Sequence, residues 1–393
     1  MKNSKLHLFA IAFIVLFIGG AFWYSKHPIS ATHNSDQPKI VYATNYFDSH
    51  GGPTKKEIHA VNLDGTKDKV IYSTVNNQEY IEVANHTHVL VSEVSPENII
   101  QKFFDKDGNS IKNVYDNFLV TSHMYEENGY SSDRKNVATF DWKSENSEGS
   151  LQIKTLNLLT RAIKEYSCSV CVGPQQEGNF HQIRGWSADN AKVYFSISRD
   201  DSHMHPGSEP NNKYFSLDLR SGNITPLALS SKFFDYYRFY PEYGMAFKMP
   251  ITSFATDPAS ITGIDLNDFS EKFVFNSLPM ESIQGFNGKY ILYKVLFPNF
   301  KHNVIRSINV ETKEQKDVLP VGLVNTSKEG DKDVLAFLPD KNNTFLYKVE
   351  YDNGWEVRTH DIATEEDRNV LFLTAEQLKD GMSSYKEYLG VIF

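Results

Sequence analysis

Cysteine is scarce in this sequence, with two among 393 residues. Two cysteines can form at most one intrachain bridge, so a packed core rather than a disulfide framework must hold the fold together. Positive charge is also in deficit: 40 lysine and arginine residues face 49 aspartate and glutamate residues, a formal net charge of −9. An acidic chain with scattered basic residues has no uniform attraction for phosphate backbones. We therefore expect no nucleic-acid partner.

Long apolar runs are missing too, with one exception near the N-terminus. Residues 8–24 are uninterruptedly apolar, and as a helix they would reach about 26 Å, nearly the thickness of a bilayer core. Lys2 and Lys5 precede the run, and positive charge on that side predicts that the rest of the chain lies outside the cytoplasm. The segment is therefore a candidate for membrane contact.

Two interpretations of this segment stay open. We predict that residues 1–25 are a retained anchor, giving a single-pass membrane protein, and that residues 26–38 are an exposed linker. The alternative is a signal sequence cleaved after the small residues Gly19–Ala21, which leaves a secreted or periplasmic protein. Phe22–Tyr24 continue the apolar run with aromatic residues typical of a membrane interface, and this favours the anchor.

Useful helical periodicity is absent after residue 38, and short strands and turns repeat instead. Each unit has a strand ending in Asp or Asn, a tight polar turn and a second short strand. The seven Asp or Asn residues that end these strands are Asn62, Asp105, Asn157, Asp218, Asp265, Asn309 and Asp361. Units of about 40 to 60 residues made of strands and turns are typical of propeller blades. The sequence predicts an all-β, seven-bladed β-propeller over residues 39–393, with six or eight blades as alternatives.

The first repeat is one strand short, because only three strands precede the second repeat. The last segment, residues 384–393, is strand-like and has no partner within its own repeat. We predict that it completes the first blade and closes the ring. Just before it, Thr374–Gln377 fits a capping box and predicts a single helical turn.

Two segments of the fourth repeat carry a family resemblance. Residues 186–195, Trp-Ser-Ala-Asp-Asn-Ala-Lys-Val-Tyr-Phe, resemble the W-S-P-D-G-K-x-I-A-F segment of TolB-like, WD-repeat-like bacterial propellers, and Ser216–Gly222 resembles their outer hairpin. Ala188 and Asn190 replace the Pro and Gly of that pattern, and Asn tolerates a left-handed turn. The resemblance implies a periplasmic or extracellular scaffold that binds partners.

Cys168 and Cys171 form a C-x-x-C motif at the end of a predicted strand. The spacing is that of a redox pair or of half a zinc site. A second C-x-x-C is absent, and redox motifs normally begin a helix. We predict a local disulfide or two small buried residues.

Two polar loops contain histidine. His203 and His205 are two residues apart, so on an extended chain both rings would lie on the same side, with Asp200, Asp201 and Glu209 near in sequence. His50 lies in a Gly-rich turn. A metal site at His203 and His205 is one interpretation. Solvated loops collect the same residue types, so we predict neither a metal nor a cofactor.

Hydrolase motifs do not fit, since Gly185–Asp189 lacks the final Gly of G-x-S-x-G and Ser187 lies between two strands. We predict a non-catalytic, membrane-tethered propeller outside the cytoplasm that binds a protein, peptide or cell-envelope polymer. The alternative is a propeller enzyme, a glycan hydrolase or lyase, at the channel mouth. Carboxylates or histidines converging within about 5 to 9 Å there would favour the enzyme, and unrelated polar groups would favour binding.

Loop lengths predict which end of the propeller binds the partner. The connections between second and third strands are long in several repeats, at residues 47–55, 143–149, 199–212 and 250–260, whereas the hairpin turns are tight throughout. Long loops on a rigid scaffold are where binding residues collect. We expect the partner on this face, with His50, Asp200, Asp201, His203, His205 and Glu209 as candidates.

Overall fold

The computed structural model describes most of the strand-forming chain. The described residues are 38–75, 79–84, 88–94, 99–111, 129–143, 150–168, 170–171, 179–199, 212–229, 235–250, 259–277, 280–296, 303–318, 332–338, 343–351, 354–378 and 382–392. The predicted anchor and linker lie outside them, apart from Pro38 at the end of the linker. Within this part of the chain, no helix has both the length and the apolar character needed to cross a membrane.

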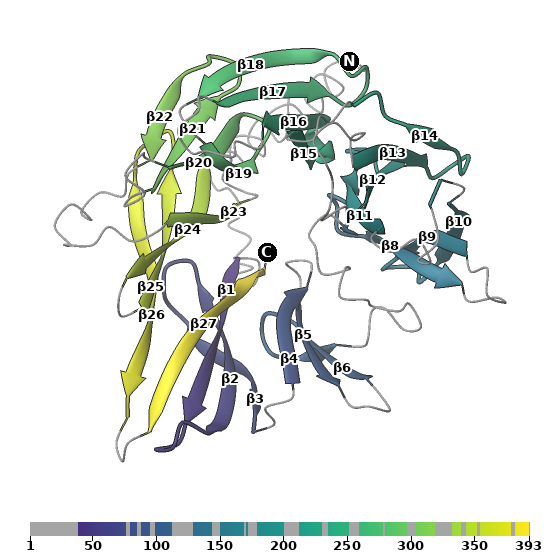
Figure 1. Ribbon diagram of the computed structural model, residues 1–393. Helices are drawn as coiled ribbons and strands as arrows, with labels where there is room; N and C mark the ends of the chain where they lie inside the picture. The colour runs from purple at the N-terminus through teal and green to yellow at the C-terminus, as the bar shows by residue number, and fades with distance from the viewer. Residues whose placement is uncertain are drawn as a thin grey trace, which may run out of the picture. The chain divides into compact units, whose positions relative to one another are not determined.

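Six sheets are arranged around a ring and form seven blades, numbered here 1 to 7, because one eight-stranded sheet contains both blade 7 and blade 1 (Figure 1). Listed from the innermost strand outward, blade 1 is β27 (Ser383–Ile392), β1 (Lys39–Phe47), β2 (Pro53–Asn62) and β3 (Lys69–Thr74). Blade 2 is β4 (Glu79–Ala84), β5 (His88–Val94), β6 (Ile99–Phe104) and β7 (Ser110–Ile111). Blade 3 has three described strands, β8 (Asn136–Lys143), β9 (Ser150–Asn157) and β10 (Ile163–Ser167).

The remaining blades have four strands each. Blade 4 is β11 (Asn179–Trp186), β12 (Lys192–Arg199), β13 (Asn212–Asp218) and β14 (Ile224–Pro226). Blade 5 is β15 (Asp235–Tyr240), β16 (Met245–Pro250), β17 (Ala259–Asp265) and β18 (Glu271–Ser277), with the 3₁₀ turn η3 (Pro241–Tyr243) after β15. Blade 6 is β19 (Met280–Phe286), β20 (Tyr290–Leu296), β21 (Asn303–Asn309) and β22 (Gln315–Val318). Blade 7 is β23 (Lys332–Phe337), β24 (Thr344–Tyr351), β25 (Gly354–Asp361) and β26 (Asp367–Gln377).

The predicted all-β, seven-bladed propeller is confirmed. Successive residues of a strand point to opposite faces of the sheet, so a strand between two blades must be apolar on both faces. In β12, Val193 and Phe195 pack into the core between blades 3 and 4, and Tyr194 packs into the core between blades 4 and 5. Seven such clusters of buried side chains fill the seven interfaces between neighbouring blades, which we call seams. Blade-to-blade burial therefore holds the fold together.

Strand β27 is the innermost strand of blade 1. It pairs antiparallel with β1 from Lys39↔Ile392 to Phe47↔Ser383. Its first residues also pair with the end of β26, which joins blades 7 and 1 into one eight-stranded sheet. The predicted helical turn at Thr374–Gln377 is wrong, because these residues extend β26 and Ala375–Gln377 bond to β27. Pairing with the next strand of the chain satisfies the backbone groups that a capping box would have bonded within the turn.

In each blade the repeated Asp or Asn ends the strand next to the outermost one or follows it directly. In six of the seven blades its side-chain oxygen accepts a hydrogen bond from the backbone N–H two residues later, as Asp218 does from Arg220. This is an Asx turn, in which the side chain replaces a backbone acceptor. Asn190 has φ 55°, so the left-handed turn predicted for it is present.

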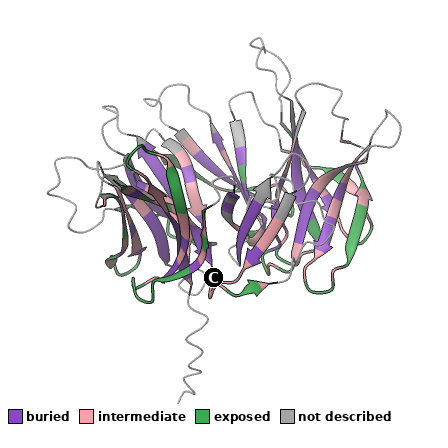
Figure 2. Ribbon diagram, turned by 90° about the horizontal axis from the view of Figure 1, so that it is seen from below, coloured by how far each residue is buried: buried purple, intermediate pink, exposed green. Residues whose placement is uncertain are grey.

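The connections divide between the two ends of the ring (Figure 2). First-to-second and third-to-fourth strand turns share one end, which we call the tight-turn end. The opposite end, the long-loop end, has the connections after β1, β8, β12 and β16, where the sequence predicts long loops. The prediction is wrong for the first of them, because residues 48–52 form a tight hydrogen-bonded turn between β1 and β2. Most residues of the other three loops lie outside the described part of the chain. Lys39 and Ile392 pair at the tight-turn end, so the described chain enters and leaves the ring there.

Candidate functional site

The inner strands of blades 4 to 7 run toward the tight-turn end, and their last residues line a cavity of about 1140 Å³. Residues of the turn after Tyr130, the 3₁₀ turn η3 and the β19–β20 turn complete its wall. Five blades thus contribute to one cavity, which we call the channel cavity.

One repeat position supplies much of the apolar wall. In blades 4 to 7 the residue that ends the innermost strand or follows it directly lines the cavity; these residues are Trp186, Tyr240, Phe286 and Leu338, and Tyr130 of blade 3 lines the same cavity. The Trp186 indole is buried, and its Nε1 donates to the Gly129 carbonyl at 2.9 Å. The rings of Tyr240 and Phe286 meet edge to face at 5.6 Å between centroids. These contacts fix the aromatic side chains before any ligand arrives.

Two glycines allow neighbouring blades to approach closely beside the cavity. Gly185 has φ +133°, and a Cβ built there would lie 2.7 Å from Cγ of Pro241. Gly288 has φ +88°, and its Cβ would lie 3.0 Å from Cδ1 of Tyr243. Any larger residue would push η3 away from its neighbours.

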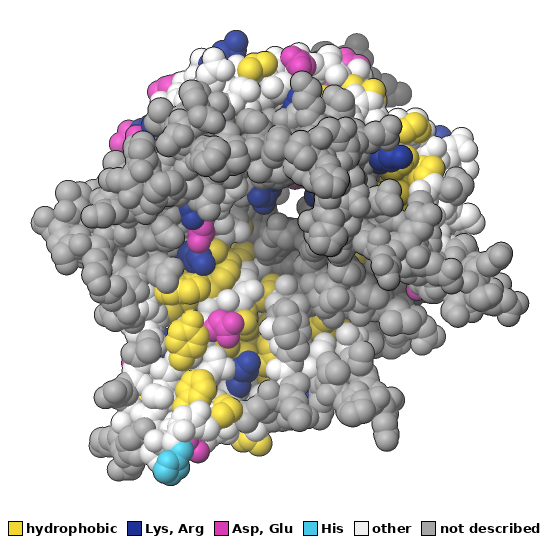
Figure 3. Space-filling view, viewed as in Figure 1, with side chains coloured by type: hydrophobic (Ala, Val, Ile, Leu, Met, Phe, Trp, Pro, Cys, Tyr) yellow, Lys and Arg dark blue, Asp and Glu magenta, His cyan; other side chains and the backbone are white. Residues whose placement is uncertain are grey.

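The cavity is cationic although the chain is acidic. Its lining contains Arg134, Arg184, Arg238 and Lys289 and a single carboxylate, Glu242, a formal charge of +3. In the view of Figure 3, lysine and arginine side chains lie beside the central opening. The lining residues contain no histidine.

Arg238 and Lys289 are both exposed. The Arg238 guanidinium donates to the Ile283 carbonyl of β19 at 2.6 Å, which ties blade 5 to blade 6. The Lys289 Nζ lies 5.3 Å from the centroid of the Tyr290 ring. Neither cation forms an ion pair with a carboxylate among the residues that the structure describes. Both charges are therefore available to a ligand that enters the cavity.

Tyr243 is the last residue of η3 and also lines the channel cavity. Its side chain is 44% exposed, while its ring packs edge to face on Phe286 at 5.2 Å between centroids. Burial of the hydroxyl, helped by the charge of Glu242, raises the pKa of Tyr243. The hydroxyl therefore stays protonated at neutral pH and can donate a hydrogen bond.

Most of the predicted site residues are not described. Asp200, Asp201, His203, His205 and Glu209 lie outside the described ranges, so their loop stays a prediction. His50 is exposed in the β1–β2 turn at the long-loop end, and its backbone N–H donates to Asp48 Oδ1 at 2.8 Å. In the described ranges, no three His, Cys, Asp or Glu side chains lie close enough to hold a metal ion.

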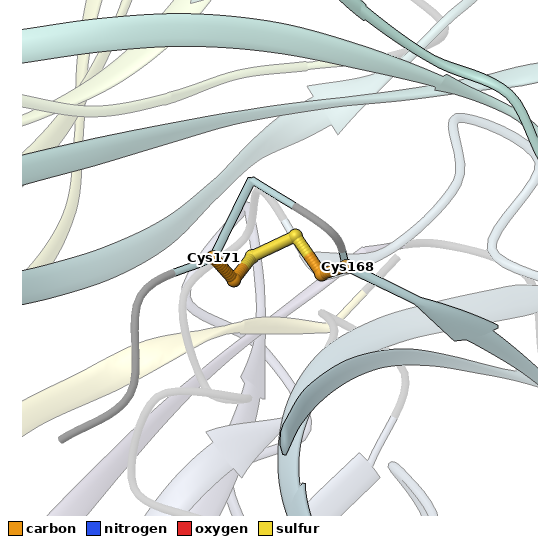
Figure 4. The surroundings of a disulfide bond; sticks show 2 residues. All are labelled: Cys168 and Cys171. Carbon is orange, nitrogen blue, oxygen red and sulfur yellow. A yellow bond between two sulfur atoms is a disulfide. The ribbon is translucent and has the colours of Figure 1, made fainter.

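Cys168 and Cys171 are joined by a disulfide in a turn after β10 (Figure 4). The Cys171 N–H donates to the Cys168 carbonyl at 3.1 Å, and Cys168 is buried in the core between blades 3 and 4. The bridge lies in the packed seam and is distant in sequence from the cavity residues of blades 5 and 6.

Ser187 and Asp189, which stand at the rejected hydrolase motif, form a turn. The Ser187 hydroxyl donates to Asp189 at 2.6 Å.

Sequence reasoning missed Arg238, Tyr243 and Lys289. A signal was present in the repeats: Arg184 and Arg238 each stand two residues before the aromatic residue that ends the first strand, and Gln284 has the same place in blade 6. Superposing the repeats on that aromatic position would have brought these polar residues together at one end of the channel.

Comparison with known proteins identifies the fold. No protein-family model and no curated protein matches the sequence. A solved prolyl endopeptidase matches 85% of this chain with 47% of its own, at 11% identity and a TM-score of 0.53. The chain is a seven-bladed β-propeller. Prolyl oligopeptidase B from Galerina marginata matches 88% of the propeller chain with 54% of its own, at 8% identity and a TM-score of 0.50.

TolB proteins are among the structural neighbours of this propeller. TolB from Acinetobacter baumannii matches 71% of this chain with 63% of its own, at 13% identity and a TM-score of 0.39. The propeller thus spans about half the length of the two prolyl peptidases and under two thirds of that TolB. These identities show the fold alone.

Proposed function

We propose that this chain is a non-catalytic binding propeller that is tethered to a membrane outside the cytoplasm and holds a protein or peptide ligand in the channel cavity. The observation that supports binding is the cavity itself: about 1140 Å³, with aromatic walls from several blades and four cations. Pre-ordered aromatic and arginine side chains are the residue types that dominate the affinity of protein interfaces.

The alternative, a glycan hydrolase or lyase, requires catalytic side chains in the cavity. Glycoside hydrolysis uses a pair of carboxyl groups about 5 to 9.5 Å apart. Glu242 is the one carboxylate among the lining residues, and the polar groups around it are amides, hydroxyls and cations. Under the criterion set from the sequence, this lining favours binding.

Site-specific photo-cross-linking tests the binding proposal and the choice of face. A photoreactive amino acid is placed at position 243 in the cavity, at 203 in the predicted long-loop site, or at Val274, which is 51% exposed on the outer strand of blade 5. We expect discrete products from position 243 in cells and none from 274. Products from 203 alone would move the binding face to the long-loop end, and none from either would contradict the proposal.

The tether has its own test. If residues 8–24 are retained in the bilayer, we expect the protein to remain in the membrane fraction through alkaline carbonate washing and to keep its N-terminal sequence. Recovery of a soluble form that starts near Phe22 would contradict the anchor and leave a cleaved signal sequence. A variant that lacks residues 1–25 is the soluble control.

A further inference from the structure

We infer that the ligand of the channel cavity is an acidic peptide segment, held by its carboxylates on Arg238 and Lys289 and by its chain on Tyr243. This inference rests on the proposed binding function and specifies its ligand. Three features of the seam between blades 5 and 6 carry it: charge, an ordered aromatic surface and unpaired strand edges.

The channel cavity and the chain as a whole have opposite formal charges. The chain as a whole has a formal charge of −9, so it repels acidic molecules except where cations are concentrated. Arg238 and Lys289 are exposed on the cavity wall and have no carboxylate partner among the described residues. The bond to the Ile283 carbonyl uses one of the five N–H donors of Arg238 and orders the side chain. An ordered guanidinium with spare donors suits bidentate binding of a carboxylate.

The aromatic surface adds contact area without further ordering. The Tyr243 ring is 44% exposed, yet Phe286 packs against it and Gly288 lies close to it. Because these contacts already fix the ring, a ligand that stacks on it loses little conformational entropy in the protein. Tyr243 thus gives the cavity wall an ordered aromatic surface beside which a ligand chain can stack.

Size and strand edges favour a peptide over a small anion. The cavity volume of about 1140 Å³ exceeds the roughly 300–1000 Å³ that is usual for small-molecule sites. Within the described sheets, β15 and β19 each pair with one strand, β16 and β20, and present their other edge to the channel. Such an edge offers backbone donors and acceptors at the spacing of an extended peptide.

Fluorescence anisotropy with the full chain in detergent tests this inference. The probe is a fluorescein-labelled octapeptide of alternating acidic (Asp or Glu) and small (Gly or Ala) residues, and its control has Asn and Gln in place of the acids. We expect binding of the acidic probe that weakens with salt, because the contacts are ionic. The double variant Arg238→Gln, Lys289→Gln is expected to raise Kd at least tenfold.

Matched variants keep the result interpretable. Lys213→Gln with Arg220→Gln removes the same charge from exposed positions of blade 4 outside the cavity, and it should leave Kd within about twofold. Tyr243→Ala should raise Kd several-fold with an unchanged salt dependence. Thermal melting of each variant shows that it is folded.

The outcomes separate the inference from the proposed function. Equal affinity for the acidic and the amide probe would overturn the requirement for carboxylates. Cavity-dependent binding of labelled heparin, an anionic sugar polymer, without binding of the acidic peptide would overturn the peptide class. Cross-linking at position 243 without binding of either probe would refute the acidic ligand. The proposal that the propeller binds a partner in the cavity would still be supported.

Discussion

Deleting residues 382–393 is expected to abolish the cooperative thermal transition of this protein. The deletion removes β27, which pairs with β1 along its whole length and fills the innermost position of blade 1. Val391 is buried in the core between blades 7 and 1, and Ile392 in the core between blades 1 and 2. The truncation therefore opens two seams of the ring and exposes the edge of β1.

The expected loss of unfolding free energy follows from the usual cost of removing buried side chains. Truncating one buried aliphatic side chain costs about 2–5 kcal/mol, and here two are lost with a strand's hydrogen bonds, against a total stability of about 5–15 kcal/mol. The measurement is calorimetry of the truncated chain beside Glu387→Gln, an exposed change on the same strand that should shift stability by less than about 0.5 kcal/mol. A truncated protein that melts like the full chain would refute the role of β27 in closure.

Asp367→Ala is expected to destabilise the protein by about 3–5 kcal/mol, because the change leaves a buried cation and hydroxyl without their acceptor. The Asp367 carboxylate is 1% exposed. It accepts a hydrogen bond from the Tyr347 hydroxyl at 2.6 Å and one from Arg358 Nε at 2.6 Å. His360 Nδ1 lies 3.4 Å from the same carboxylate. Side chains from β24 and β25 thus contact one carboxylate on β26 and link three strands of blade 7.

Blade 6 provides the matched control. Arg306 Nε donates to Asp317 at 2.5 Å between the corresponding strands, but that carboxylate is 40% exposed. Water screens the pair, so Asp317→Ala should cost about 0–1 kcal/mol. The measurement is the free energy of unfolding from urea titration at neutral pH. Equal losses for the two variants would contradict the argument from burial.

The stabilisation by Asp367 is also expected to depend on pH. Burial opposes ionisation of this carboxyl, but the hydrogen bonds from His360, Tyr347 and Arg358 outweigh burial and lower its pKa. The folded state therefore favours the ionised form, and the contribution is complete above the unfolded pKa of about 3.9 and is lost as pH falls through the folded pKa. The difference in unfolding free energy between the natural protein and Asp367→Ala should shrink below about pH 4. A constant difference down to pH 2.5 would contradict this assignment.

The sequence by itself determined the repeat count and the outer hairpins. Asp218 and its counterparts mark the ends of third strands because an Asx turn is built within a few residues, so its signal is local. Closure by residues 384–393 followed from an unfilled strand position in the first repeat. The N-terminal anchor and the loop with His203 and His205 are predictions on residues outside the described structure.

Only the tertiary structure decided the site and the end of the chain. The lining of the channel cavity comes from positions as far apart as Tyr130 and Leu338, and no local pattern shows that a ring will bring them to one end. Thr374–Gln377 matched a helical capping pattern but became strand, since Thr374 pairs with Gly354 of β25 and Ala375–Gln377 pair with β27. Short-range hydrogen bonds are encoded within a few residues, whereas a cavity and a closed ring depend on contacts that exist only after the seven blades have packed.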